Sequence, residues 1–192
     1  MRRAGRSPAA VDFLTNTATS LGADRGTPAP EALAARTCLM LTAAYTAAST
    51  NQRGTALDLL QEATETSARI PTGRPLGLFT IQASLAECAM YSISTHTALH
   101  TPDEGVRHVN SVTPVQLPTA ERRARFHTDT ARMWHQIGDS HRAYTALRAV
   151  EREAPEEARR PAIQALTADL LYSHRNLPGL REFALRTGAV AS

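Results

Sequence analysis

The chain has 192 residues, 42% of them apolar and 20% charged, a composition that argues against disorder throughout its length. Aromatic residues make up only 5% and alanine is frequent, so the core must be built from helices packed closely around small side chains. All 21 basic residues are arginine, and the net charge of +3 does not indicate a basic face, because residues 121–160 mix nine arginines with seven acids.

In chain order, helices are expected to begin where Ser or Thr precedes Pro, and to end at Gly, Pro or a polar turn. The first half of the chain contains four such segments, over residues 8–21, 28–49, 55–70 and 77–94. The second and third of these segments are expected to form an antiparallel helical hairpin, because only the polar turn "STNQRG" separates them.

The second half of the chain continues this pattern after a loop rich in His and Thr. The sequence "TPDE", from Thr101 to Glu104, is a capping box that predicts a short helix ending at Val112. Four further helices are expected after it, over residues 119–137, 140–154, 160–174 and 178–187. No segment alternates polar and apolar residues over the length of a strand, so no sheet is expected.

The stretch "ARMWHQIGDSHRAYTALRAVEREAP", residues 131–155, has the residue order of a helical hairpin. Ala131 and Ala143 stand twelve residues apart on opposite sides of a turn at Gly138, where small side chains would let two helices cross closely. The residues expected to pack in this hairpin, and in an earlier one with the same alanine spacing, are Ala44, Ala56, Ala131, Trp134, Gly138, Ala143, Leu147 and Pro155. The set resembles the tetratricopeptide repeat, a helical hairpin of about 34 residues.

A second resemblance covers the chain from about residue 30 to the end. It is most specific in "LPTAERRARFHTDTARMWHQIGDSHRAYTALRAVEREAPEEARRPAIQALTADLL", which resembles the C-terminal helical-repeat domain of actinobacterial transcription regulators. Those regulators carry an Xre-type helix-turn-helix domain at the N-terminus, and the resemblance implies that the repeats act as a sensor or dimerisation module. Fewer than 30 residues precede the resembling segment, so the helix-turn-helix domain is expected to be absent, which places direct nucleic-acid binding in doubt.

The expected helix over residues 119–137 carries a polar stripe with two arginines. In repeats of this kind the first helix of each hairpin lines a concave groove, where two guanidiniums could hold a carboxylate or a phosphate. The alternative is that Arg125 only pairs with Glu121 and Asp129, each four residues away along the helix. With one residue from the first hairpin, the candidate groove consists of Tyr45, Arg125, Thr128, Arg132, His135 and Gln136.

Other chemically active residues do not form a recognisable site. Cys38 and Cys88 lie in apolar helical segments without metal-ligand spacing, which indicates buried, reduced thiols. His96 and His100 are four residues apart in the expected loop, but no acid or cysteine stands where it would complete a metal site. Neither a phosphate loop nor a nucleophile elbow occurs. No catalytic residue, metal or cofactor is therefore expected, and without a signal peptide or membrane span the protein is expected in the cytoplasm.

These features predict an all-α protein whose antiparallel helical hairpins stack as a short, right-handed solenoid like that of tetratricopeptide repeats. Residues 1–26 are expected to form an N-terminal segment with a capping helix, and residues 27–192 the repeat domain. The expected function is non-catalytic recognition of a protein, peptide or small effector in the groove, within a transcriptional regulatory system. A homodimer is compatible with this function. The alternative is a nucleic-acid-associated regulator that contacts phosphate through surface arginines.

Overall fold

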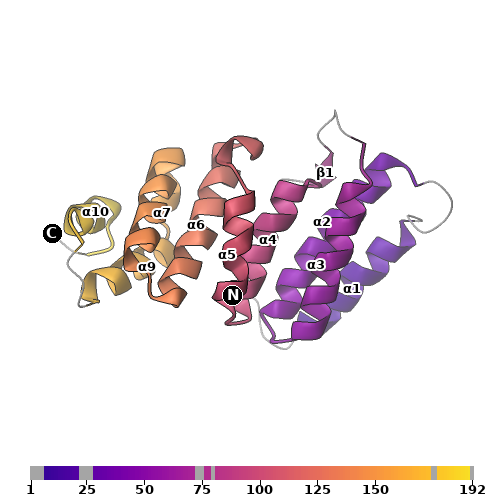
Figure 1. Cartoon of the computed structure of the whole chain (residues 1–192), viewed down its shortest axis with the longest axis horizontal. Helices are drawn as coiled ribbons and strands as arrows, with labels where there is room; N and C mark the ends of the chain where they lie inside the picture. The colour runs from indigo at the N-terminus through magenta and orange to yellow at the C-terminus, as the bar shows by residue number, and fades with distance from the viewer. Residues whose placement is uncertain (1–6, 22–27, 72–75, 79–80, 174–176, 191–192) are drawn as a thin grey trace. The chain divides into compact units, whose positions relative to one another are not determined.

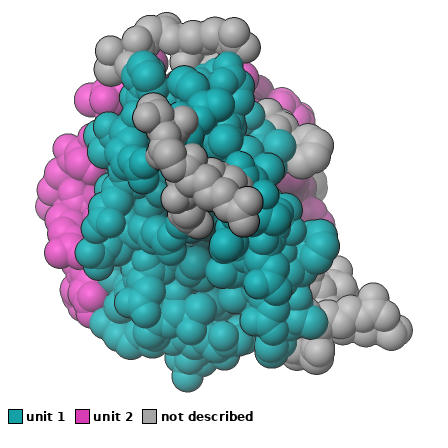
Figure 2. All heavy atoms as spheres, turned by 90° about the vertical axis from the view of Figure 1, so that its right-hand side faces the viewer, with its two compact units in different colours: residues 1–101 teal, residues 102–192 magenta. Residues whose placement is uncertain are grey.

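The computed structural model describes residues 7–21, 28–71, 76–78, 81–173 and 177–190. These residues form ten α-helices, one 3₁₀ turn and one two-stranded hairpin, so the all-α class is confirmed (Figure 1). The chain divides into two compact units, residues 1–101 and residues 102–192, which Figure 2 shows in different colours. Within the described residues, no helix has both the length and the apolarity needed to span a bilayer.

The first unit is built around two long helices joined by a short turn. Its elements are α1 (Ser7–Ser20), α2 (Pro30–Ala48), α3 (Arg53–Ala68), β1 (Gly77–Leu78), β2 (Ile81–Gln82) and α4 (Leu85–Ala98). Helix α2 contacts α1, α3 and α4, so it is the central helix of the unit. Ala44 and Ala47 of α2, and Ala56 and Ala63 of α3, are completely buried, and their small side chains let the helices approach closely.

The predicted N-terminal capping helix takes part in the core of the first unit. Val11 and Ala18 of α1 lie in the same apolar cluster as Leu41 of α2 and Leu60 of α3. The domain boundary predicted between residues 26 and 27 falls in a segment outside the described residues. The division between the two compact units comes after residue 101.

The predicted helix over residues 77–94 is confirmed from Leu85 onward and wrong before it, and the expectation of no sheet is wrong, because β1 and β2 pair antiparallel before α4 begins. A Cβ on Gly77 would lie 2.2 Å from the carbonyl oxygen of Ile81, so the close approach of the two strands requires glycine. The Ser84 hydroxyl then accepts a hydrogen bond from the backbone N–H of Glu87 at 3.2 Å, which caps the first turn of α4.

The end of α4 and the beginnings of two other helices also differ from the prediction. Helix α4 continues to Ala98 through the segment expected to be a loop, and His96 in its last turn is 3% exposed. Packing of α4 against α2 and α3 outweighs the modest helix propensity of its serines and threonines. Helix α2 begins at Pro30, two residues later than expected, and α3 begins at Arg53, two residues earlier.

The second unit contains one long helical hairpin and several shorter helices. Its elements are α5 (Pro102–Ser111), the 3₁₀ turn η2 (Pro114–Gln116), α6 (Ala120–Ile137), α7 (Ser140–Glu153), α8 (Pro155–Ala158), α9 (Pro161–Tyr172) and α10 (Leu180–Thr187). Helices α6 and α7 pack along each other, and α9 contacts both. Ala124 of α6 and Val150 of α7 form an apolar cluster with Ala154 and Ala158, so α8 is held against this hairpin.

The ends of α6 and α7 follow the signals seen in the sequence. The Thr119 hydroxyl accepts a hydrogen bond from the backbone N–H of Arg122 at 3.1 Å, and this cap begins α6. Gly138 ends α6 in the left-handed conformation, with φ of 89°. The Asp139 carboxylate then accepts a hydrogen bond from the backbone N–H of Arg142 at 2.9 Å and caps α7. These signals fix where α6 begins and ends and where α7 begins.

Candidate functional site

The predicted arginine stripe lies on α6, where two of its members contact the same acid. Nε of Arg125 lies 3.0 Å from Oδ2 of Asp129, and Nη1 of Arg132 lies 3.5 Å from Oδ1 of that carboxylate. The Asp129 side chain is 4% exposed, whereas the side chains of Arg125 and Arg132 are 46% and 35% exposed. A buried carboxylate is thus placed between two partly exposed guanidiniums, and we call these three residues the Asp129 cluster.

The geometry of the Asp129 cluster follows from helix spacing. Arg125 stands four residues before Asp129 and Arg132 three residues after it, so all three side chains share one face of α6. A carboxylate removed from water needs charged partners or hydrogen-bond donors, which the two arginines supply. One carboxylate offsets only one of the two guanidinium charges, so the cluster keeps a net positive charge.

The other predicted groove residues differ in accessibility. Thr128 is buried, with 7% of its surface exposed, which leaves little of it for contact with a ligand. His135 is half-buried and Gln136 is exposed, both in the last turn of α6. Tyr45 is half-buried on α2, in the first unit. The structure therefore brings Arg125 and Arg132 together through Asp129.

Six of the eight residues predicted to pack inside the hairpins are buried, whereas Gly138 and Pro155 are exposed. Those with 0% exposure are Ala44, Ala56, Ala131, Ala143 and Leu147. Trp134 is 9% exposed, and the guanidinium carbon of Arg142 lies 4.5 Å from the centre of its ring, in the geometry of a cation–π contact. Pro155 was expected to end the second helix; α7 ends at Glu153, and Pro155 is exposed and is the first residue of α8.

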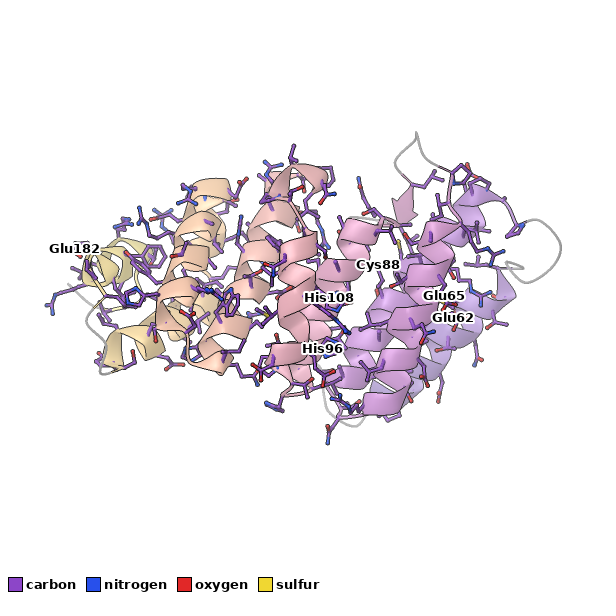
Figure 3. All side chains as sticks on the ribbon, viewed as in Figure 1. Glu62, Glu65, Cys88, His96, His108 and Glu182 are labelled. Atoms are coloured by element: carbon purple, nitrogen blue, oxygen red, sulfur yellow. The ribbon has the colours of Figure 1, made fainter. Side chains whose placement is uncertain are left out.

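The paired histidines and the two cysteines differ in burial. His96 is buried in α4 (Figure 3), whereas His100 is exposed beyond its end, with φ of 58°. Cys38 and Cys88 are both buried free thiols, and desolvation by burial raises the pKa of Cys88 to about 11, so this thiol stays protonated at neutral pH. The part of the chain that the structure describes holds no group of three or more side chains suited to a metal ion.

The sequence is compatible with Arg125 facing a ligand and with Arg125 pairing along the helix. The pair with Asp129 is present, so this alternative describes part of what the arginine does. The spacing of four residues signalled that contact, but the near-complete burial of Asp129 could not be read from the sequence. The contact between Arg142 and Trp134 was also missed, because it joins different helices and has no local sequence signature.

Comparison of the chain with protein-family models, curated proteins and solved structures finds no match. The fold therefore defines the protein only as a predominantly helical chain with one short β-hairpin. Its resemblance to tetratricopeptide repeats and to actinobacterial regulators stays a prediction from the sequence.

Proposed function

We propose that the chain is a non-catalytic binding module of a transcriptional regulatory system, and that its α6 face binds the anionic group of a peptide or small effector. The Asp129 cluster is the observation that supports this proposal. Its two guanidiniums are partly exposed, and a buried carboxylate holds both on one helix face.

The physical advantage of the cluster is preorganisation. A free arginine side chain loses rotamer freedom when it grips a ligand, and that loss lowers the affinity. Contact with Asp129 restricts both guanidiniums before a ligand arrives, so less freedom is lost on binding. Arg132 is the better candidate for ligand contact, because its 3.5 Å distance to Asp129 is the longer of the two and its side chain is 35% exposed. A carboxylate or phosphate could then accept hydrogen bonds from the guanidinium.

We further propose that the hairpins α2–α3 and α6–α7 are repeat units of the tetratricopeptide type. Each carries a completely buried alanine on both helices, Ala44 with Ala56 and Ala131 with Ala143, twelve residues apart. This is the small-residue pattern on which the sequence resemblance rests. A repeat of this type uses helix faces for recognition, which agrees with a ligand on α6.

The proposal is tested by adding a decaglutamate peptide to the full-length, ¹⁵N-labelled protein and following the backbone amide signals by NMR. Signals of α6 around Arg132 should shift progressively with peptide concentration. Arg132→Ala should weaken this binding while leaving the helical circular-dichroism signal intact. The matched control is Arg181→Ala, which removes an exposed arginine of α10 and should preserve the α6 shifts.

Two outcomes would contradict the α6 proposal. One is peptide binding that Arg132→Ala does not weaken, because Arg132 would then lie outside the site. The other is the absence of shifts in α6 at any peptide concentration. Native mass spectrometry of protein purified gently from its own cells would complement the titration. An acidic molecule retained by the natural protein and lost in Arg132→Ala would identify the ligand.

A further inference from the structure

The outer face of α7 carries a basic stripe. His141, Thr145, Arg148 and Arg152 are all exposed, and their spacings of four, three and four residues place them on one side of the helix. The stripe is about 16 Å long at the rise of an α-helix. Its two charged residues are both arginines and it contains no acid, so this stripe differs from the mixed charge pattern of the surrounding sequence.

Two acids of α7 pair with arginines of other helices and not with the arginines of the basic stripe. Glu151 accepts two hydrogen bonds from Arg186 of α10, at 2.7 and 2.9 Å. Glu153 accepts one from Arg123 of α6, at 2.6 Å. Neither Arg148 nor Arg152, by contrast, forms an ion pair with any residue that the structure describes. Acids and arginines alternate in the sequence, but contacts between helices pair the two acids elsewhere. The basic stripe of α7 therefore stays positively charged.

The outer face of α3 in the first unit has the opposite charge. Asp58 and Glu65 are exposed and seven residues apart, about 10 Å along the helix, with Glu62 between them in sequence. Figure 3 labels Glu62 and Glu65 on this helix. Glu65 accepts a hydrogen bond from Gln61 at 2.9 Å. Gln61 is neutral, so this contact does not offset the negative charge of Glu65. Glu62 pairs with Arg36 of α2. We call Asp58, Glu62 and Glu65 the acidic stripe.

We infer that the basic stripe of one copy of this chain docks on the acidic stripe of a second copy. Both faces are helical and their charges are opposite, and the acidic stripe, about 10 Å long, fits within the basic stripe of about 16 Å. Within the described part of the chain, neither Arg148 nor Arg152 pairs with an acid, and Asp58 pairs with no cation. Neither stripe contains a large apolar side chain, so an apolar partner has nothing to bury there. Charge complementarity therefore identifies the occupant as another copy.

The strength of the self-association follows from the exposed ion pairs that form it. Exposed ion pairs are weak one at a time and are screened by salt, because water competes for both charges. The resulting association is reversible, and it weakens as the salt concentration rises. The inference is independent of ligand binding by α6, because it uses none of the residues of the Asp129 cluster.

The test is sedimentation velocity of the full chain over a range of protein concentrations, at low and at high NaCl. The natural protein should sediment faster as its concentration rises at low salt, and should lose this dependence at high salt. The double variant Arg148→Glu/Arg152→Glu should weaken self-association about tenfold or more, because repulsion replaces attraction at the contact. Asp58→Arg/Glu65→Arg should do the same from the other side.

Mixing the two double variants gives the decisive measurement. Each alone presents two faces of like charge, whereas the mixture restores opposite charges between the two chains and should associate again. The control variant Arg159→Glu/Arg181→Glu changes two exposed arginines outside α7 and should associate like the natural protein. Circular dichroism of every variant establishes that its helices are intact.

Three results would overturn the inference. The first is a natural protein that remains monomeric at every concentration at low salt. The second is self-association that both charge-reversal variants retain. The third is a mixture of the two variants that does not associate although each is folded. If the monomeric protein instead binds a duplex DNA or RNA probe, and Arg148→Glu/Arg152→Glu abolishes that binding, the basic stripe serves a nucleic acid.

Discussion

Nε of Arg125 lies 3.0 Å from Oδ2 of Asp129, and the acid in this pair is 4% exposed while the arginine is 46% exposed. The two partners therefore differ in what they lose without the contact. Arg125 can return to water, whereas Asp129 would keep a charge in a place that water scarcely reaches. The main effect of the pair is therefore to stabilise the buried charge of Asp129, which distinguishes it from a salt bridge between two exposed residues.

This asymmetry predicts different effects of substitution within the Asp129 cluster. Asp129→Asn should lower the free energy of unfolding by about 1.5–3 kcal/mol, since it removes the charge of a buried hydrogen-bonded group. Arg132→Ala should cost less than about 1 kcal/mol, because its contact is long and partly exposed to solvent. Urea unfolding followed by circular dichroism measures both. Equal losses in the two variants would show that burial of Asp129 does not govern the cluster.

Ala131 tests the packing of the α6–α7 hairpin. The residue is completely buried, so Ala131→Leu should overpack the contact and lower the free energy of unfolding by about 1–3 kcal/mol. Thermal and urea unfolding give the measurement. The matched control is Ala165→Leu, which places the same side chain at an exposed position of α9 and should change little. An unchanged melting curve for Ala131→Leu would show that this site has room for a larger residue.

Substitution of Gly138 would measure the cost of backbone strain without a contribution from steric overlap. Its φ is 89°, and a Cβ placed on it would meet no atom within 4 Å. Gly138→Ala should therefore lower the free energy of unfolding by about 1–2 kcal/mol through the left-handed backbone alone. A Cβ on Gly54 of α3 would also meet no atom within 4 Å, and the φ of this residue is not positive. Gly54→Ala should therefore raise the free energy of unfolding by about 0.5–1 kcal/mol. Urea unfolding of both variants should give changes of opposite sign, and a shared sign would contradict this account.

Cys88 should be unreactive in the folded protein. The thiolate is the reactive form, and desolvation by burial raises the pKa of this thiol to about 11 in spite of hydrogen bonds with Ser67 and Thr64 that lower it. At about pH 8, iodoacetamide should therefore modify Cys88 only when the protein is unfolded in urea. Peptide mass spectrometry measures the modification. Rapid labelling of the native protein would show that α4 opens readily.

The sequence allowed much of the helical architecture to be predicted, because caps and breakers act locally. Thr119, Gly138 and Asp139 satisfy or end the hydrogen bonds of the helices they flank, so α6 and α7 were located nearly to the residue. Contacts between distant segments left no such signal. The pairing of Gly77 with Gln82 involves strands of two residues, too short to show a period. The helical end of α4 likewise depends on packing by α2 and α3.

For the candidate site, too, local features could be predicted from the sequence and contacts between distant segments could not. Periodicity placed Arg125 and Arg132 on one face of α6, and the structure agrees. Periodicity could not show that Thr128 is buried on that helix, because burial depends on what covers the face. The sorting of charges on α7 was equally hidden, since Arg186 pairs with Glu151 across 35 residues of sequence. Local spacing therefore predicts which residues share a face, and tertiary structure decides which of them remain accessible.

His127 on α6 should make the stability of the fold depend on pH. Desolvation lowers its pKa below the ordinary 6.5 in the folded protein, with a further lowering by Arg152 and an opposing effect of Glu153. The unfolded chain thus binds the proton more readily than the folded one. The contribution of this histidine is complete above about pH 6.5 and is lost as the pH falls through the lower pKa of the folded state.

The prediction is checked by urea unfolding at several pH values between about 7.5 and 5. In His127→Gln the loss of stability toward acid should be smaller than in the natural protein, because the neutral side chain cannot take up the proton. The matched control is His141→Gln, which replaces an exposed histidine of α7 and should retain the natural dependence. A steeper loss in His127→Gln would reverse the sign of the argument, since it would require the folded state to favour the protonated histidine.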